Sequence, residues 1–324
     1  MKKLLYFVGL LLCLQLTAQS DKYDIVIYGG TSAGIIAAIQ ASRMGKSVVL
    51  IEPTSRIGGL TTGGLGQTDI GNKQAIGGIS REFYENIKTY YDIPKNWKWQ
   101  KPSDYRDGGQ SITDENENSM WTFEPSAALS VFDKMIQKEN IKLVYNERLN
   151  RESGVQKSEG KITSITMLSG KTFMGDIFID TTYEGDLMAT AGVTYSVARE
   201  SNDEYGETLN GVQANIVNTT LTGGISRNGM YHNFIPKVDP YVIKGNPTSG
   251  LLPNVIIGPG IEGTGDNKIQ AYNFRMCLTD APGNRIPFIK PEGYEEIEYE
   301  LLFRNFEART ETVLEMYNYC LLYT

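Results

Sequence analysis

A glycine-rich cluster and one acid near the start of the chain have the residue types and the spacing that bind a dinucleotide. The cluster comprises Gly29, Gly30, Thr31, Ser32, Ala33 and Gly34. A pyrophosphate needs bare backbone N–H groups, a close approach of the main chain and the positive end of a helix. Glu52 follows 18 residues after Gly34, close to the ~20-residue spacing at which a carboxylate reaches a ribose hydroxyl.

The elements that must position these residues form a strand–helix–strand unit. Residues 25–28 are a short β-branched apolar run, typical of a parallel strand buried on both faces. Helix-forming residues follow over 33–44, and a second apolar run over 47–51 leads into the acid. Thr31 stands at the second glycine of the G-x-G-x-x-G pattern, so the backbone must approach the phosphates slightly differently. An ordinary α/β crossover without a ligand is the alternative.

Later segments add a second strand–turn–helix element over 176–192, which can also present backbone N–H groups to a cofactor. The glycine-rich stretch 58–78 fits main chain that wraps closely around a ligand, with a flexible surface loop as the alternative. The remaining pattern predicts helices over 79–90, 124–138 and 295–319, an irregular excursion over about 91–120, and strands over 142–146, 160–168, 171–173 and 213–221.

Several blocks of the sequence together resemble the FAD-dependent oxidoreductases whose FAD domain is built like that of glutathione reductase. More narrowly, the chain is similar to a secreted bacterial branch grouped near heterodisulfide reductase. The matching blocks run over residues 29–34 with Glu52, 56–59, 63–66, 75–78, 123–125, 180–187 and 271–275. The resemblance covers about 22–305, essentially the whole chain after its first 20 residues.

The resemblance implies an α/β fold: a Rossmann-like FAD/NAD(P)-binding domain with a β-meander, plus an inserted α+β substrate lobe. It implies FAD as the cofactor, with its ADP half on the first strand–helix–strand unit. Arg56, Gly58 and Gly59 would then lie along the pyrophosphate and ribityl chain, and the strand at Val144 would supply backbone to the adenine. The segment with Asp180, Glu184, Gly185 and Asp186 would close over the dinucleotide.

Candidates for catalysis are fewer, because flavin itself carries the hydride chemistry. Arg275 lies in an aromatic run and could stabilise a reduced flavin anion or a substrate carboxylate, although an arginine paired to a carboxylate at a lobe boundary is an equal alternative. His232 is the only histidine and could act as a general base, but a surface histidine in a loop is the more common case. Tyr183 and Glu184 are expected to act mainly through their backbone positions.

Composition excludes several other classes of protein. The 324 residues carry a formal net charge of −7 without a basic block, which argues against nucleic acid and anionic lipid as partners. A single histidine excludes multi-histidine metal sites, and the two cysteines beyond the first 20 residues cannot ligate a four-cysteine cluster. Cys277 and Cys320 could pair, but their number and spacing form no disulfide framework. The expected partners are a small-molecule substrate and an electron acceptor, both unidentified.

The first 20 residues read as a secretory signal peptide: two lysines, an apolar run too short for a comfortable membrane span, and a small or polar exit. We therefore expect cleavage after Ala18, export to the periplasm or beyond, and no membrane span in the mature chain. The expected domains are a signal peptide (1–18), an FAD-binding domain (22–200) and a substrate or cap region (201–324). Kin of this branch have longer chains with a further FAD-contacting segment, so a truncated product is expected.

The function expected from these observations is hydride transfer between an organic substrate and FAD. One alternative is a nicotinamide dehydrogenase that uses the same strand–helix–strand unit. The other is a truncated, non-catalytic flavin-binding or glycan-accessory protein.

Overall fold

The computed structural model describes residues 22–66, 72–105, 117–213, 238–258, 260–269 and 277–308. The chain divides into two compact units, one up to residue 194 and the other from residue 195 onward. This division lies near the expected domain boundary at 200.

The first unit is built on a six-stranded sheet with the order β3-β2-β1-β6-β5-β4. The strands are β1 (Lys22–Tyr28), β2 (Val48–Ile51), β3 (Lys142–Val144), β4 (Val155–Ser158), β5 (Lys161–Thr166) and β6 (Thr172–Asp180). β3, β2, β1 and β6 are mutually parallel, whereas β4, β5 and β6 form an antiparallel meander. The prediction of a Rossmann-like α/β domain with a β-meander is confirmed.

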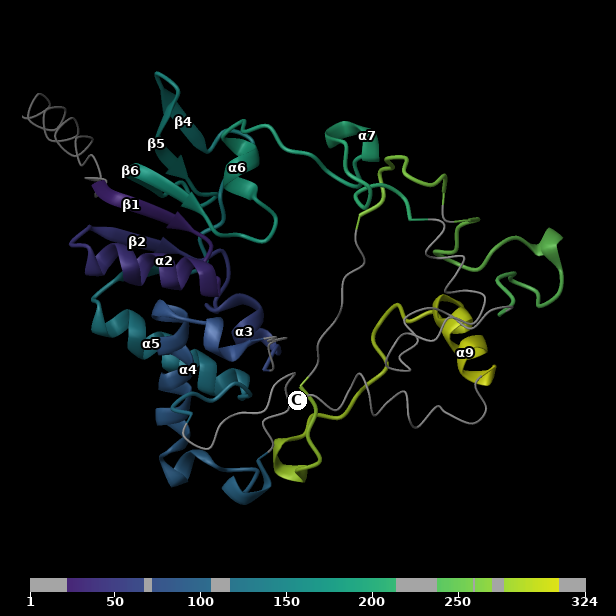
Figure 1. Cartoon of the computed structure of the whole chain (residues 1–324), viewed down its shortest axis with the longest axis horizontal. Helices are drawn as coiled ribbons and strands as arrows, with labels where there is room; N and C mark the ends of the chain where they lie inside the picture. The colour runs from purple at the N-terminus through teal and green to yellow at the C-terminus, as the bar shows by residue number, and fades with distance from the viewer. Residues whose placement is uncertain are drawn as a thin grey trace, which may run out of the picture. The chain divides into compact units, whose positions relative to one another are not determined.

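Helices cover the sheet on the side where β1 and β2 present half of their side chains. These helices are α2 (Ser32–Arg43), α4 (Gly78–Tyr91) and α5 (Pro125–Lys138), which lie together in Figure 1. Ile27 and Leu50 enter the hydrophobic cluster that contains these helices, while Val26 and Val49 enter a second cluster with residues of β5 and β6. Alternate residues of one strand point to opposite faces, so both short apolar runs are buried on both faces.

Three elements of the first unit differ from the sequence prediction. The two runs predicted over 171–180 form one strand, β6, because its beginning pairs with β5 while its later residues pair with β1. β3 ends at Val144, since Asn146 adopts a left-handed φ of 58° and donates its N–H to Thr54 O at 3.0 Å. β4 was not predicted, and the glycine-rich stretch contains a short helix, α3 (Gly59–Gly63).

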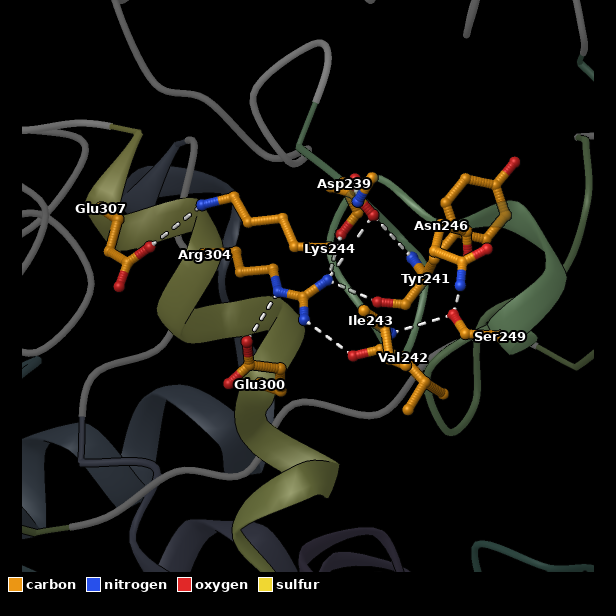
Figure 2. A network of polar contacts seen from close by, with 11 residues as sticks. Asp239, Tyr241, Val242, Ile243, Lys244, Asn246, Ser249, Glu300, Arg304 and Glu307 are labelled. Carbon is orange, nitrogen blue, oxygen red and sulfur yellow. Dashed lines mark hydrogen bonds and ion pairs between the residues drawn. The ribbon is translucent and has the colours of Figure 1, made fainter.

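The described part of the second unit contains α7 (Asn202–Tyr205), α9 (Glu300–Glu307) and isolated turns. Buried Arg304 of α9 donates to the carbonyls of Asp239, Tyr241 and Val242 and to Glu300 Oε1 (Figure 2). The helix predicted over 295–319 is observed at 300–307, after a 3₁₀ turn at Glu296–Tyr299. Most of the strand predicted over 213–221 lies outside the described residues.

Candidate functional site

The carboxyl ends of the four parallel strands meet at one edge of the sheet. Tyr28 of β1 is in register with Ile51 of β2 and Asp180 of β6, and Ile51 is in register with Val144 of β3. The segments that follow these four residues therefore lie next to one another. This edge is where open α/β sheets bind ligands, and we call it the carboxyl edge.

The turn after β1 needs glycine at two positions. Gly29 has a φ of 106°, and a Cβ atom there would lie 2.7 Å from the backbone carbon of Thr181. A Cβ atom at Gly34 would lie 2.1 Å from Gly29 O. Contacts this short do not occur for real Cβ atoms, so the turn can pass this close to β6 and α2 only with these glycines.

α2 begins immediately after this turn, with Thr31 as its N-cap. Thr31 Oγ1 accepts the N–H of Gly34 at 3.3 Å, which satisfies one of the amides left unpaired at a helix start. Ser32 is half-buried and Ala33 is exposed, so the first turn of this 12-residue helix reaches the surface at the carboxyl edge. The positive end of a helix at this position suits a pyrophosphate.

Glu52 is 6% exposed and its carboxylate is held by the chain itself. Oε2 accepts the N–H of Gly30 at 2.8 Å, and Oε1 accepts the N–H and the hydroxyl of Thr54 at 2.7 and 2.6 Å. A Cβ atom at Gly30 would lie 2.7 Å from Oε2, so this position also requires glycine. A carboxylate offers about four acceptor sites, and these three donors leave one for a ribose hydroxyl.

The second glycine segment packs directly on the first turn. Gly58 donates its N–H to Gly30 O at 2.7 Å, and Gly58 and Gly59 have φ values of 92° and 53°. The guanidinium of Arg56 donates Nε and Nη2 to Thr62 O of α3, at 3.0 and 2.7 Å. Arg56 therefore braces the segment that the sequence predicts along the pyrophosphate; contact with the phosphates stays a prediction.

Asp180 closes the turn between β6 and α6 (Asp186–Thr190). Its Oδ1 accepts the N–H and the hydroxyl of Thr182 at 2.9 and 2.7 Å, and its Oδ2 accepts the N–H of Met188 at 2.8 Å. Gly185 precedes α6 in a left-handed conformation, with a φ of 69°. The acid thus shapes the turn that was expected to close over the dinucleotide.

The other residues of this turn differ in what they contact. Tyr183 accepts the N–H of Leu60 on its hydroxyl at 2.8 Å, which joins the turn to α3. Asp186 lies 3.5 Å from Arg151 Nη1, and Glu184 is exposed. Glu184 and Asp186 have no contact with the glycine turn or Glu52 in the hydrogen bonds of the described residues, so their cofactor roles stay predictions.

Val144 lies at the same edge, and its carbonyl accepts the N–H of Glu52 at 2.8 Å. That carbonyl belongs to the sheet, so an adenine contact from this strand would need another backbone group near its end. Arg275 and His232, the candidates for catalysis, both lie outside the described residues, as does Cys320.

Ionisable side chains near Glu52 make this end of the site acidic. Partial burial raises the pKa of Tyr145, and the charges of Asp133 and Glu52 raise it further. Burial also raises the pKa of Asp133, against the opposing charge of Arg56. These causes place two carboxylates and one phenol around the position where a ribose is expected.

Sequence reasoning missed the residues that join these segments. Thr54 follows Glu52 by two residues, and its type in a Pro-Thr-Ser stretch is a signal for a local turn. Thr181 donates its hydroxyl to Gly29 O at 2.6 Å, but a threonine in an apolar strand gives no signal of such a role. Its partner is 152 residues away.

Membrane spans and metal clusters are both missing from the described residues. None of the helices found there has the length and apolar character needed to cross a membrane. Within the same ranges, no group of three or more histidine, cysteine, aspartate or glutamate side chains is placed to hold a metal ion.

Comparison with solved structures gives partial matches. L-Proline dehydrogenase from P. horikoshii is 15% identical with a TM-score of 0.35, over 56% of this chain and 59% of that protein. A 3-ketosteroid dehydrogenase from Rhodococcus jostii RHA1 is 18% identical (TM-score 0.31; 51% and 47% covered), and thioredoxin reductase from T. acidophilum is 18% identical (0.28; 50% and 35%). The chain thus spans less than two thirds of these proteins, and the low TM-scores add nothing to the argument.

Comparison with curated proteins gives no match. A family model described as FAD dependent oxidoreductase matches residues 24–321. This range contains the glycine turn, Glu52 and the Asp180 turn. The chain therefore belongs to the FAD dependent oxidoreductase family, and its cofactor is FAD.

Proposed function

We propose that this protein transfers hydride between a small organic substrate and FAD, and that the carboxyl edge holds the ADP half of the cofactor. The observation that carries the proposal is the hydrogen bond from Gly30 N–H to Glu52 Oε2, at 2.8 Å. It joins the pyrophosphate-binding turn to the ribose-binding acid, so both parts of the dinucleotide site form one unit. Bound flavin supplies the hydride chemistry.

The chain's own groups have distinct tasks in this proposal. The first-turn amides of α2, at Ser32 and Ala33, face the pyrophosphate, because this helix end is exposed and carries positive partial charge. The remaining acceptor site of Glu52 takes a ribose hydroxyl. Gly58 and Gly59 carry the second segment past the first turn, where any larger residue would meet Thr62 or Tyr183.

The substrate side of the proposal depends on the sequence alone. We assign Arg275 to a substrate carboxylate or the reduced flavin, and His232 to proton transfer. A separate electron acceptor must reoxidise the flavin, because a dehydrogenase that keeps its electrons turns over only once.

The test uses the purified full chain. Visible absorption, and release of FAD on acid treatment followed by chromatography, measure the bound flavin; NAD and NADP are offered in parallel. We expect flavin absorption and a higher thermal unfolding temperature with FAD only. A well-folded protein that stays colourless after incubation with FAD, and is stabilised by NAD instead, refutes the proposal in favour of a nicotinamide dehydrogenase.

We also propose that the protein is exported, as in the secreted bacterial branch that the sequence resembles. Two lysines followed by an apolar run and Thr17-Ala18 support this proposal. Intact mass measured on periplasmic and cytoplasmic fractions tests it. Cleaved protein outside the cytoplasm supports export, and only full-length protein in the cytoplasm contradicts it.

A further inference from the structure

We propose that Thr31 and Thr181 form a hydrogen-bonded clasp that positions the pyrophosphate-binding turn, and that Thr31 improves FAD binding over the glycine usual at its position. The proposal rests on the function proposed above. It assigns a positioning role to two residues, neither of which is required to touch the cofactor.

The clasp fixes the two segments in both directions. Thr31 Oγ1 donates to Thr181 O at 2.8 Å. In return, Thr181 donates its hydroxyl to Gly29 O at 2.6 Å and to Tyr28 O at 3.0 Å, and its N–H to Tyr28 O at 2.8 Å. The last residue of β1, the glycine turn and the first residue of α2 are thus held against the end of β6.

The hydroxyl of Thr31 has two partners at once, and their chemistry determines its direction. Gly34 N–H can only donate and Thr181 O can only accept, so Oγ1 accepts from the first at 3.3 Å and donates to the second. Thr31 is 8% exposed. A serine can make both bonds, whereas a glycine can make neither.

The clasp matters for binding because the turn has almost no freedom to adjust. A Cβ atom at Gly29 would lie 2.7 Å from Thr181 and one at Gly34 would lie 2.7 Å from Thr181 Oγ1, so these groups are already in close contact. Small displacements of the β6 end therefore move the turn and the first-turn amides of α2. Groups held in place before the ligand arrives bind more tightly, since less ordering remains to be done.

The sharpest test is Thr31→Gly, which restores the G-x-G-x-x-G pattern. We expect the dissociation constant for FAD, measured by titrating the apoprotein, to rise about 5- to 10-fold. Thr181→Val keeps the shape of the side chain but removes its donor, and it should weaken FAD about 5-fold. Thr31→Ser and Thr181→Ser keep both hydroxyls and should bind FAD within about twofold of the wild type.

Two controls separate positioning from general stability. Thr163→Val makes the same substitution at an exposed residue of β5 and should not change FAD affinity. The unfolding temperature of each apoprotein is measured alongside, because a clasp that acts through position weakens FAD binding more than it lowers this temperature. In the double variant Thr31→Gly/Thr181→Val, the loss should be smaller than the product of the single losses.

The outcomes distinguish this inference from the proposed function. Wild-type protein that binds FAD, with Thr31→Gly binding it equally well or better, overturns the clasp and leaves the function standing. Failure of the serine variants to restore affinity also overturns it. Wild-type protein that does not bind FAD refutes the proposed function itself.

Discussion

Replacement of Glu52 by glutamine tests the centre of the candidate site, because it removes the charge and keeps the size. The carboxylate accepts three donors: Gly30 N–H on one oxygen and the N–H and hydroxyl of Thr54 on the other. A glutamine has one carbonyl oxygen, so its NH₂ group must face either Gly30 N–H or Thr54 N–H. One buried backbone donor then loses its acceptor in either orientation.

The magnitude follows from these bonds. An unsatisfied buried donor costs about 1–3 kcal/mol of unfolding free energy. A hydrogen bond to a charged group contributes about 1.5–3 kcal/mol, so loss of the ribose contact should raise the FAD dissociation constant about 10- to 150-fold. We therefore expect Glu52→Gln to lower both the stability of the apoprotein and its affinity for FAD.

The assay is a fluorescence titration of apoprotein with FAD, together with thermal unfolding of each form. Glu152→Gln is the matched control, since it makes the same change at an exposed residue in a turn of the same unit. FAD affinity within twofold of wild type in a folded Glu52→Gln protein would refute the ribose role. A loss equal to that of Glu152→Gln would refute it as well.

Three further substitutions test other parts of the structure. Arg43 pairs with Glu82 and Glu139, and the bonds to Arg43 lower the pKa of Glu82 below its ordinary value of 4.5; Arg43→Gln should therefore lower the unfolding free energy by about 1 kcal/mol at pH 7. That difference should disappear as the pH falls through the lowered pKa of Glu82, and a constant difference down to pH 3 in acid titrations of unfolding would contradict it. The buried hydroxyl of Ser119 has no hydrogen-bond partner among the described residues, so Ser119→Ala should keep or raise the thermal unfolding temperature, by up to about 1 kcal/mol of stability, whereas a clear loss would reveal a hidden partner. Arg304→Lys cannot reproduce a fork that reaches three carbonyls and a carboxylate, so limited proteolysis should cut near 238–252 faster than in wild type, and an unchanged digestion pattern would argue against it.

Much of the fold could be predicted because its signals are local. The runs 25–28 and 47–51 are apolar at nearly every position, which is typical of buried parallel strands, and both form strands in the structure. The glycines at 29 and 34 and the acid at 52 have a fixed spacing that follows from the geometry of a strand–helix–strand unit. Residues with weak local signals were predicted less well: β4, over Val155–Ser158, is mostly exposed and polar, and it exists because β5 pairs with it.

The sequence by itself determined the strand–helix–strand unit, the two glycine segments and the acid at the end of β2. These features follow from backbone conformation and side-chain size, which each residue carries wherever it lies. Only the tertiary structure decided how the segments meet: that Gly30 N–H bonds to Glu52, that Thr31 and Thr181 hold the turn, and that Tyr183 joins the Asp180 turn to α3. Such bonds join residues that are tens to more than a hundred positions apart, and their geometry depends on how the whole sheet packs.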